Sequence, residues 1–181
     1  NCHNVVMKHL EFERCTSMAA VVSPRCSDFT FEDFNVRIPA GDHALYSANA
    51  DAIHITGLSG YLHMKDCDFV GLGDDALNIH SQAGEIESWN PETGEMSCIY
   101  RNRAMEPGKL GALWAQGGDT IVVYDRETFL EKGKLLLSDY RDGKALVEKV
   151  TGECGVGDIL ANEELFGQDI SFLTEEIEGC R

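Results

Sequence analysis

Pairs of apolar residues separated by one polar residue recur at a constant spacing in the first half of the chain. The four pairs are Val5/Met7, Phe29/Phe31, Ile53/Ile55 and Leu77/Ile79, each 24 residues after the one before. Alternation of apolar and polar side chains is typical of a strand with one buried face. A fixed period of this length predicts a solenoid in which each coil stacks on the previous one.

Further apolar columns share this 24-residue register. The expected columns are Val21/Leu45/Phe69, Leu10/Phe34/Leu58 and Ile38/Leu62/Ile86. The coil is too long for hexapeptide helices, and it lacks the helical segment of leucine-rich repeats. We therefore predict an all-β fold in which residues 1–86 form a segment of a right-handed parallel β-helix.

The register ends after Ile86, and shorter strand patterns follow. Asn90–Gly94 has the composition of a turn, and Asp142-Gly143 is a strong hairpin signal between two strand-like runs. Asp119–Tyr124 supplies another strand rich in β-branched residues. We expect residues 87–157 to be an inserted small antiparallel β-barrel.

The last residues repeat a pattern of the first. Asp169–Phe172 with Cys180 matches Asn4–Met7 with Cys15, since each cysteine lies 11 residues after the leading polar residue. Residues 158–181 are therefore expected to return to the β-helix. Because solenoids need caps at their ends, we expect a piece of a longer protein, whose open end strands can pair in a homodimer.

The composition excludes several classes of partner and cofactor. A net charge of −16 argues against nucleic acid and anionic membranes as partners, and no apolar stretch is long enough to cross a bilayer. None of the seven cysteines forms a CxxC pair, and the six histidines lack an HExxH motif. We therefore expect no metal and, without a P-loop or GxGxxG motif, no nucleotide cofactor.

Three aspartates are the candidate catalytic residues. Asp51 and Asp75 are 24 residues apart, and Asp74 adjoins Asp75. Neighbouring parallel strands lie about 4.8 Å apart, so the three carboxyls should cluster, and one should stay protonated because like charges repel. A protonated carboxyl and a carboxylate are the pair that glycoside hydrolysis requires. The alternatives are a plain turn at Gly73-Asp74-Asp75 or a calcium site.

Polar residues beside this cluster are candidates for binding sugar hydroxyls, although they could equally be solvated surface. They are Asn49, His54, Asn78 and His80. Two tryptophans, Trp89 and Trp114, could stack on a sugar ring, but aromatic residues of a small barrel more often belong to its core. The expected partner is thus an oligosaccharide or glycan.

These motifs resemble those of glycoside hydrolase family 110, the α-1,3-galactosidases. That family has a similar Asp … Asp-Asp arrangement, here at 23 and 24 residues, and a β-barrel module inserted in a β-helix. The resemblance implies an inverting exo-enzyme of bacterial origin that removes terminal α-1,3-linked galactose without a metal. It also implies Asp51 as general acid, with Asp74 and Asp75 positioning and deprotonating water, and a secreted or periplasmic location, with the cytoplasm not excluded.

A more distant resemblance is to the polygalacturonase-type β-helix hydrolases. They share an Asn-x-Asp strand start followed one coil later by Gly-Asp-Asp, but their Gly-His-Gly and Arg-x-Lys motifs are absent from this sequence. The alternatives to a galactosidase are therefore a polygalacturonase-like hydrolase or lyase, and a non-catalytic carbohydrate-binding β-helix. The motifs are specific only over residues 49–81.

Overall fold

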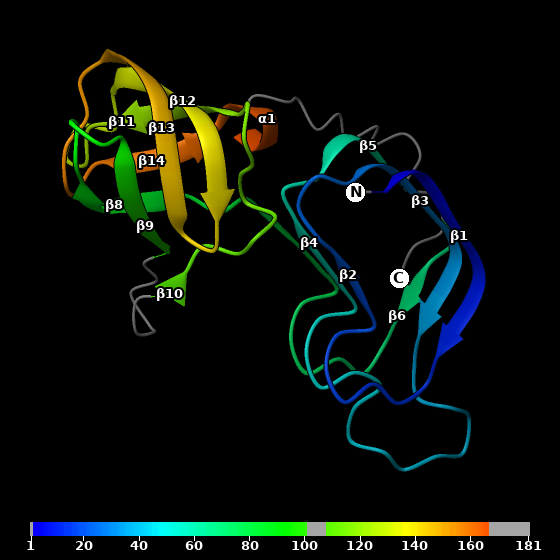
Figure 1. Cartoon of the computed structure of the whole chain (residues 1–181). Coiled ribbons are helices and arrows are strands. Elements are labelled where there is room, and N and C mark those ends of the chain that lie inside the picture. Colours follow the sequence, from blue (N-terminus) through cyan, green and yellow to red (C-terminus); the bar gives the residue numbers. More distant parts are fainter. Residues whose placement is uncertain (1, 101–107, 167–181) are drawn as a thin grey trace. The chain divides into compact units, whose positions relative to one another are not determined.

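The computed structural model describes residues 2–100 and 108–166, which form two compact units that divide between His80 and Ser81 (Figure 1). Both units are built from strands, and the described residues include one short helix, α1 (Glu163–Phe166). The predicted all-β class is therefore confirmed. In the described part of the chain, no helix has the length and apolar character needed to span a membrane.

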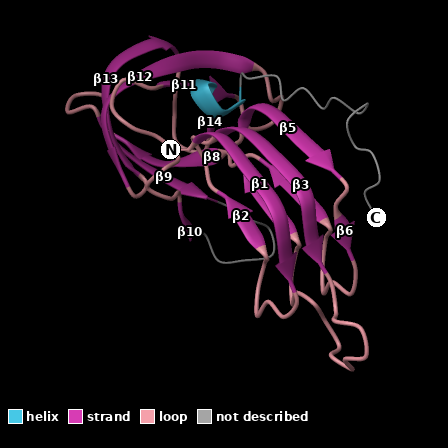
Figure 2. Cartoon of the chain, turned by 90° about the vertical axis from the view of Figure 1, so that its right-hand side faces the viewer, coloured by secondary structure: helices cyan, strands magenta, loops and turns pink. Residues whose placement is uncertain are grey.

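The first unit consists of parallel strands. Its described strands are β1 (His3–Phe12), β2 (Ala20–Val22), β3 (Ser27–Val36), β4 (Ile53–Thr56), β5 (Ser59–Lys65), β6 (Asp68–Phe69) and β7 (Leu77–His80). One sheet has the order β1-β3-β5, with β6 also paired to β3 (Figure 2). The other sheet has the order β2-β4-β7. Isolated parallel bridges join Cys15 to Ala48 and Ala48 to Leu72. Successive passes of the chain therefore stack along three lines.

Aromatic side chains from β1, β3 and β6 form the centre of this unit. Phe31 and Phe34 are completely buried. The Phe34 ring lies 5.1 Å from the rings of both Phe12 and Phe31, and 6.4 Å from that of Phe69. Burying each such side chain contributes about 1.5–3 kcal/mol. Packing between residues of successive passes thus holds the strands in register.

The 24-residue period applies to two of the four main strand pairings. Val5 pairs with Phe29 in β1–β3, and Ile53 pairs with Leu77 in β4–β7, both at 24 residues. Phe29, however, pairs with Leu62 in β5, and β2 pairs with β4, both at 33 residues. Phe29 and Ile53 therefore belong to different sheets, and the prediction that they stack is wrong.

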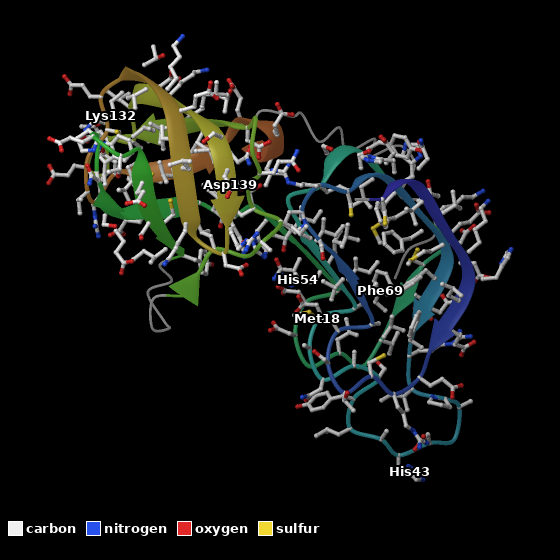
Figure 3. The ribbon with its side chains drawn as sticks, viewed as in Figure 1. Met18, His43, His54, Phe69, Lys132 and Asp139 are labelled. Carbon is white, nitrogen blue, oxygen red and sulfur yellow. The ribbon has the colours of Figure 1, made fainter. Side chains whose placement is uncertain are left out.

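A loop of nine additional residues explains this difference. Two residues lie between the end of β1 and the bridge at Cys15, whereas eleven lie between Val36 and the bridge at Ala48. The loop carries His43, labelled in Figure 3, and Asp42 within it forms an ion pair with Arg14.

The apolar columns predicted to pass through this loop are wrong for the same reason. They are Val21/Leu45/Phe69, the Phe34/Leu58 step and the Ile38/Leu62 step. The Leu62/Ile86 step is also wrong, because Ile86 pairs with Cys98 in the barrel. Leu45 is 78% exposed because it lies in the loop. The step from Leu10 to Phe34 is confirmed, because it lies before the loop.

The second unit is a closed antiparallel barrel. Its described strands are β8 (Gly84–Trp89), β9 (Glu95–Tyr100), β10 (Gly108–Lys109), β11 (Thr120–Tyr124), β12 (Glu131–Arg141), β13 (Lys144–Gly152) and β14 (Ile159–Asn162). Six strands follow the order β9-β13-β12-β11-β14-β8, and β8 pairs with β9 to close the ring, while β10 extends from β9. The predicted hairpin turn joins β12 to β13, with Asp142 and Gly143 at φ of 48° and 83°.

The barrel begins and ends outside the predicted limits of 87 and 157. Ile86 pairs with Cys98 and is fully buried in the barrel core, and Leu160 of β14 pairs with Gly84 of β8. Closure requires these first and last strands to pair with each other, so both belong to the barrel. The predicted return strand at Asp169–Phe172, with Cys180, lies outside the described residues.

Polar groups inside the barrel are paired. The Trp114 side chain is 1% exposed and donates from Nε1 to the carbonyl of Gln82 at 2.8 Å. The Tyr140 hydroxyl donates to the carbonyl of Leu110 at 3.1 Å and accepts from the amide of Gly143 at 3.0 Å. Burial raises the pKa of Tyr140 to about 12. Trp114 is therefore a core residue, as expected for an aromatic side chain in a small barrel.

We predict that Tyr140→Phe lowers the free energy of unfolding by about 1–3 kcal/mol, because a buried amide and a carbonyl lose their partner. Chemical denaturation measured by circular dichroism checks this value. Tyr124→Phe, at a half-buried position of the same barrel, is the control and should change the free energy by less. An unchanged midpoint for Tyr140→Phe would contradict the assigned hydrogen bonds.

Tyr140→Phe should also change how folding stability depends on pH in the alkaline range. Because the pKa of Tyr140 is higher in the folded state, folding stability is lost as pH rises from about 10 towards about 12. Burial also raises the pKa of Cys98 to about 12, so part of this loss persists in Tyr140→Phe. The variant should therefore lose less stability than the wild type over this pH range.

Candidate active site

Pairing of β4 with β7 brings the three aspartates together. The amide of Ala52 donates to the carbonyl of Asp75 at 2.9 Å, so Asp51 and Asp75 precede their strands at the same level. Carboxylate oxygens of Asp51, Asp74 and Asp75 all lie within 4.8 Å of one another. The predicted cluster is thus confirmed as geometry, while the catalytic roles stay predictions.

Gly73 allows this close approach. A Cβ atom added to Gly73 would lie 2.6 Å from the carbonyl oxygen of Asn49, well inside van der Waals contact. The Gly73 amide donates to the carbonyl of Ala48 at 2.9 Å on the same side. The Gly-Asp-Asp motif therefore has a role in packing successive passes of the chain, beyond that of a turn.

The three carboxyls lie in different environments. Asp51 is 2% exposed, whereas Asp74 and Asp75 are exposed to solvent. A buried carboxylate is costly unless it is hydrogen-bonded, and Oδ2 of Asp51 lies 2.6 Å from Nδ1 of His54. Asp75 has a weaker contact, from Nδ2 of Asn78 at 3.4 Å. One shielded and two solvated carboxyls in one cluster can take different roles in acid–base chemistry.

Two histidines continue the polar contacts from Asp51. His54 is stacked on Asn78, and Thr56 on His80, as predicted. Nε2 of His54 lies 2.9 Å from Nε2 of His80, which is also 3.3 Å from Oγ1 of Thr56. Figure 3 shows Phe69 inside the first unit, where it packs against the core, and His54 on the outer face of the sheet that contains β4.

The predicted sugar-binding residues differ in their burial and in the contacts that they already make. Both ring nitrogens of His54 already have protein partners, so His54 is less available for a sugar hydroxyl than expected. Asn49 is exposed at the level of the cluster, and Asn78 is half-buried beside Asp75. Sequence reasoning missed the His54–His80 contact, since it runs diagonally between strands rather than along one column.

The aspartate cluster is also where a cation would find ligands in the described part of the chain. No other group of three or more His, Cys, Asp or Glu side chains meets that geometry there. We assign no metal ligands, because Asp51 already uses Oδ2 for His54 and exposed carboxylates commonly cluster without an ion.

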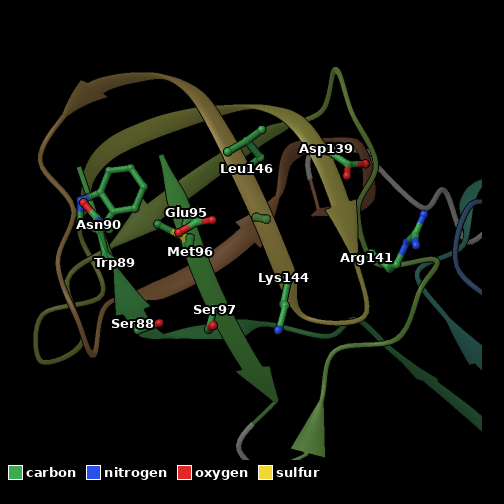
Figure 4. Close-up of a pocket in the computed structure, with 11 residues that line it drawn as sticks. Ser88, Trp89, Asn90, Glu95, Met96, Ser97, Asp139, Arg141, Lys144 and Leu146 are labelled. Atoms are coloured by element: carbon green, nitrogen blue, oxygen red, sulfur yellow. The ribbon is translucent and has the colours of Figure 1, made fainter. Parts of the chain in front are cut away.

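A pocket of about 690 Å³ lies on the second unit (Figure 4). Strand pairing places Arg141, Lys144, Ser97 and Ser88 in one row across β12, β13, β9 and β8. Trp89 also lines the pocket, but it packs against the barrel core as well. The residues that line this pocket belong to the second unit, whereas the aspartate cluster belongs to the first.

We predict that Gly73→Ala lowers the free energy of unfolding by about 1–3 kcal/mol, because the new methyl group forces the two passes apart. Denaturant titration measures the change. Gly111→Ala is the control, since an added Cβ there meets nothing within 4 Å. Equal stability of the two variants would show that the close contact at Asn49 is not required.

Comparison with known proteins identifies distant relatives. No protein-family model matches the sequence. An alpha-1,3-galactosidase B of Bacteroides thetaiotaomicron is 25% identical over 60% of this chain and 17% of its own length. The alpha-1,3-galactosidase B of Akkermansia muciniphila is 29% identical over 54% of this chain and 12% of its own length. That of Bacteroides fragilis is 27% identical over 60% of this chain and 18% of its own length.

The matched segments span less than one fifth of each relative. They nevertheless agree in the family that they indicate, which is also the one whose motifs this sequence resembles. This chain is distantly related to the α-1,3-galactosidases.

Proposed function

We propose that this chain is part of a glycoside hydrolase that removes terminal α-1,3-linked galactose from an oligosaccharide or glycan. The observation that carries the proposal is the cluster of one shielded and two solvated carboxyls, within 4.8 Å, just before two adjacent strands. The distant relationship to proteins named alpha-1,3-galactosidase B supports the choice of substrate.

The environments of the carboxyls suggest their roles. Asp51 is shielded from water and held by His54, as suits a general acid that must give its proton to the glycosidic oxygen. Asp74 and Asp75 are exposed, so they can hold a water molecule and accept its proton as it attacks the anomeric carbon. Asn49 and Asn78 are the neighbours best placed to bind sugar hydroxyls.

Inversion is part of this proposal and requires a side-chain movement. Inverting glycosidases separate their two carboxyl groups by about 6.5–9.5 Å, and retaining ones by about 5–5.5 Å. The closest oxygens here lie within 4.8 Å. Rotation of the exposed side chain of Asp74 or Asp75 away from Asp51 provides the room for water. Retention is the outcome expected if that rotation does not occur.

We also propose that the first unit is a segment of a right-handed parallel β-helix. Two parallel sheets and a line of parallel bridges repeat on each pass of the chain, which supports this assignment. The barrel then follows β7 as an inserted module. Pairing of open end strands in a homodimer, and a secreted or periplasmic location, stay predictions.

We predict that Asp51→Asn reduces galactose release from an α-1,3-linked galactobioside by about 10²–10⁴-fold, because the general acid is lost. Enzymatic assay of free galactose measures the rate, and proton NMR identifies the anomer first released, expected to be β. Asp66→Asn is the control, since Asp66 is exposed and has φ of 53°, which asparagine tolerates. Undiminished release by Asp51→Asn would refute the assigned role.

A calcium-binding lyase or structural β-helix is the second candidate, favoured by the proximity of the three carboxylates. Under the hydrolase proposal, 1 mM calcium should leave the free energy of unfolding unchanged relative to EDTA. A site with a dissociation constant a hundredfold below the calcium concentration would instead add about 2.7 kcal/mol. Such a gain, lost in Asp75→Asn, would favour the second candidate.

A further inference from the structure

The contacts of Asp51 extend through two histidines to a partly exposed ring. We propose that His54 and His80 form a proton-transfer chain that positions Asp51 and returns a proton to it after each turnover. This inference rests on the proposed function, because it concerns the resetting of the general acid. It assigns to both histidines a role other than binding sugar.

The proposed reaction leaves a proton imbalance at the site. The bond from the anomeric carbon to the leaving oxygen breaks, and that oxygen takes the proton of Asp51. Water forms the new bond to the anomeric carbon and gives one proton to Asp74 or Asp75. The exposed carboxyl can release this proton to solvent directly, whereas Asp51, 2% exposed, has little contact with water. A side chain that is hydrogen-bonded to Asp51 can therefore supply its new proton.

The two histidines provide hydrogen-bonded steps along a route to Asp51. The distances are 2.6 Å from Oδ2 of Asp51 to Nδ1 of His54 and 2.9 Å from Nε2 of His54 to Nε2 of His80. The two rings meet edge to face, with centroids 4.9 Å apart and an angle of 78° between them. The side chain of His54 is 20% exposed and His80 is half-buried, so both rings have more contact with solvent than Asp51.

The side chains of Asp51, His54 and His80 can hold their protons in two arrangements that both keep these hydrogen bonds. The Nε2–Nε2 contact requires one nitrogen to carry a proton and the other to accept it. With Asp51 ionised, Nδ1 of His54 donates to the carboxylate and Nε2 accepts from a doubly protonated His80. A shift of both bridging protons yields neutral Asp51, neutral His54 and neutral His80. The total charge is the same before and after, so a proton taken from solvent by His80 reloads Asp51.

The neighbouring groups are suited to both states. Oγ1 of Thr56, 3.3 Å from Nε2 of His80, can donate or accept a hydrogen bond. The titratable groups that face Asp51 are Asp74 and Asp75, whose negative charges favour movement of a proton towards the cluster. On the opposite side of His54, β2 places the apolar Val21. The proposed proton-transfer chain of His54 and His80 therefore joins the aspartate cluster to solvent at His80.

The test compares two substrates with different needs for an acid. Hydrolysis of an α-1,3-linked galactobioside requires a proton on the leaving oxygen, whereas α-galactosyl fluoride loses fluoride without one. His54→Gln and His80→Gln should each lower kcat for the disaccharide by about 10-fold or more, a partial loss of general-acid catalysis. Both should stay within about 2-fold of the wild type on the fluoride, with unchanged KM.

The control is His9→Gln. His9 forms a similar histidine–aspartate pair, with Nδ1 2.9 Å from Oδ2 of Asp33, but both side chains are exposed in the other sheet of the unit. This variant should retain wild-type rates on both substrates. Added imidazole should restore disaccharide hydrolysis by His80→Gln, because a diffusible proton donor replaces the lost ring.

Two results would overturn the proton chain. Equal losses on both substrates, or a raised KM, would assign the histidines to sugar binding or structure. Independent titration of His54 and His80 in nitrogen NMR spectra, unaffected by substitution of the other ring, would show that they share no proton. If the wild type cleaves neither substrate, the proposed function fails, and the NMR titration still decides whether the chain exists.

Discussion

Backbone pairing between β4 and β7 is the constraint on which the candidate site depends. The hydrogen bond from Ala52 to Asp75 sets the level at which two acidic segments meet, and Ile53 stacks on Leu77 behind them. A shift by one residue would turn the alternate side chains to the opposite face. The absence of a side chain at Gly73 permits the close contact with Asn49 that accompanies this register. Apolar packing inside the first unit therefore positions the carboxyls beside the starts of β4 and β7.

The cluster concentrates negative charge, which is unfavourable for folding, and the structure limits that cost in two ways. Asp51 is shielded but hydrogen-bonded to a histidine, and its two neighbours are solvated. Stored repulsion of this kind is typical of sites that perform chemistry rather than of structural surfaces. The diagonal contact from His54 to His80 then links the shielded carboxyl to solvent. Burial of Asp51 limits its contact with water, and the proposed proton transfer through His54 and His80 compensates for that limit.

Sequence periodicity predicted the site better than it predicted the fold. The 24-residue step is correct for Ile53 and Leu77, and this local step alone brings Asp51 to Asp75. The same step fails between Phe29 and Ile53, because a loop of nine additional residues shifts the register while the apolar spacing happens to persist. In the barrel, the Asp142-Gly143 hairpin was predictable from turn chemistry. Closure through β8 and β14 was not, since it depends on pairing between strands about 75 residues apart.

The central claim is that the three aspartates surround the reacting carbon of a terminal galactose. A crystal structure of the protein soaked with galactose tests it most directly, because the sugar reports the position of the site without requiring turnover. The account predicts that the anomeric hydroxyl lies within hydrogen-bonding distance of Asp51, with Asp74 and Asp75 facing the anomeric carbon. Galactose bound at the barrel pocket instead, with the aspartate cluster untouched, would contradict it.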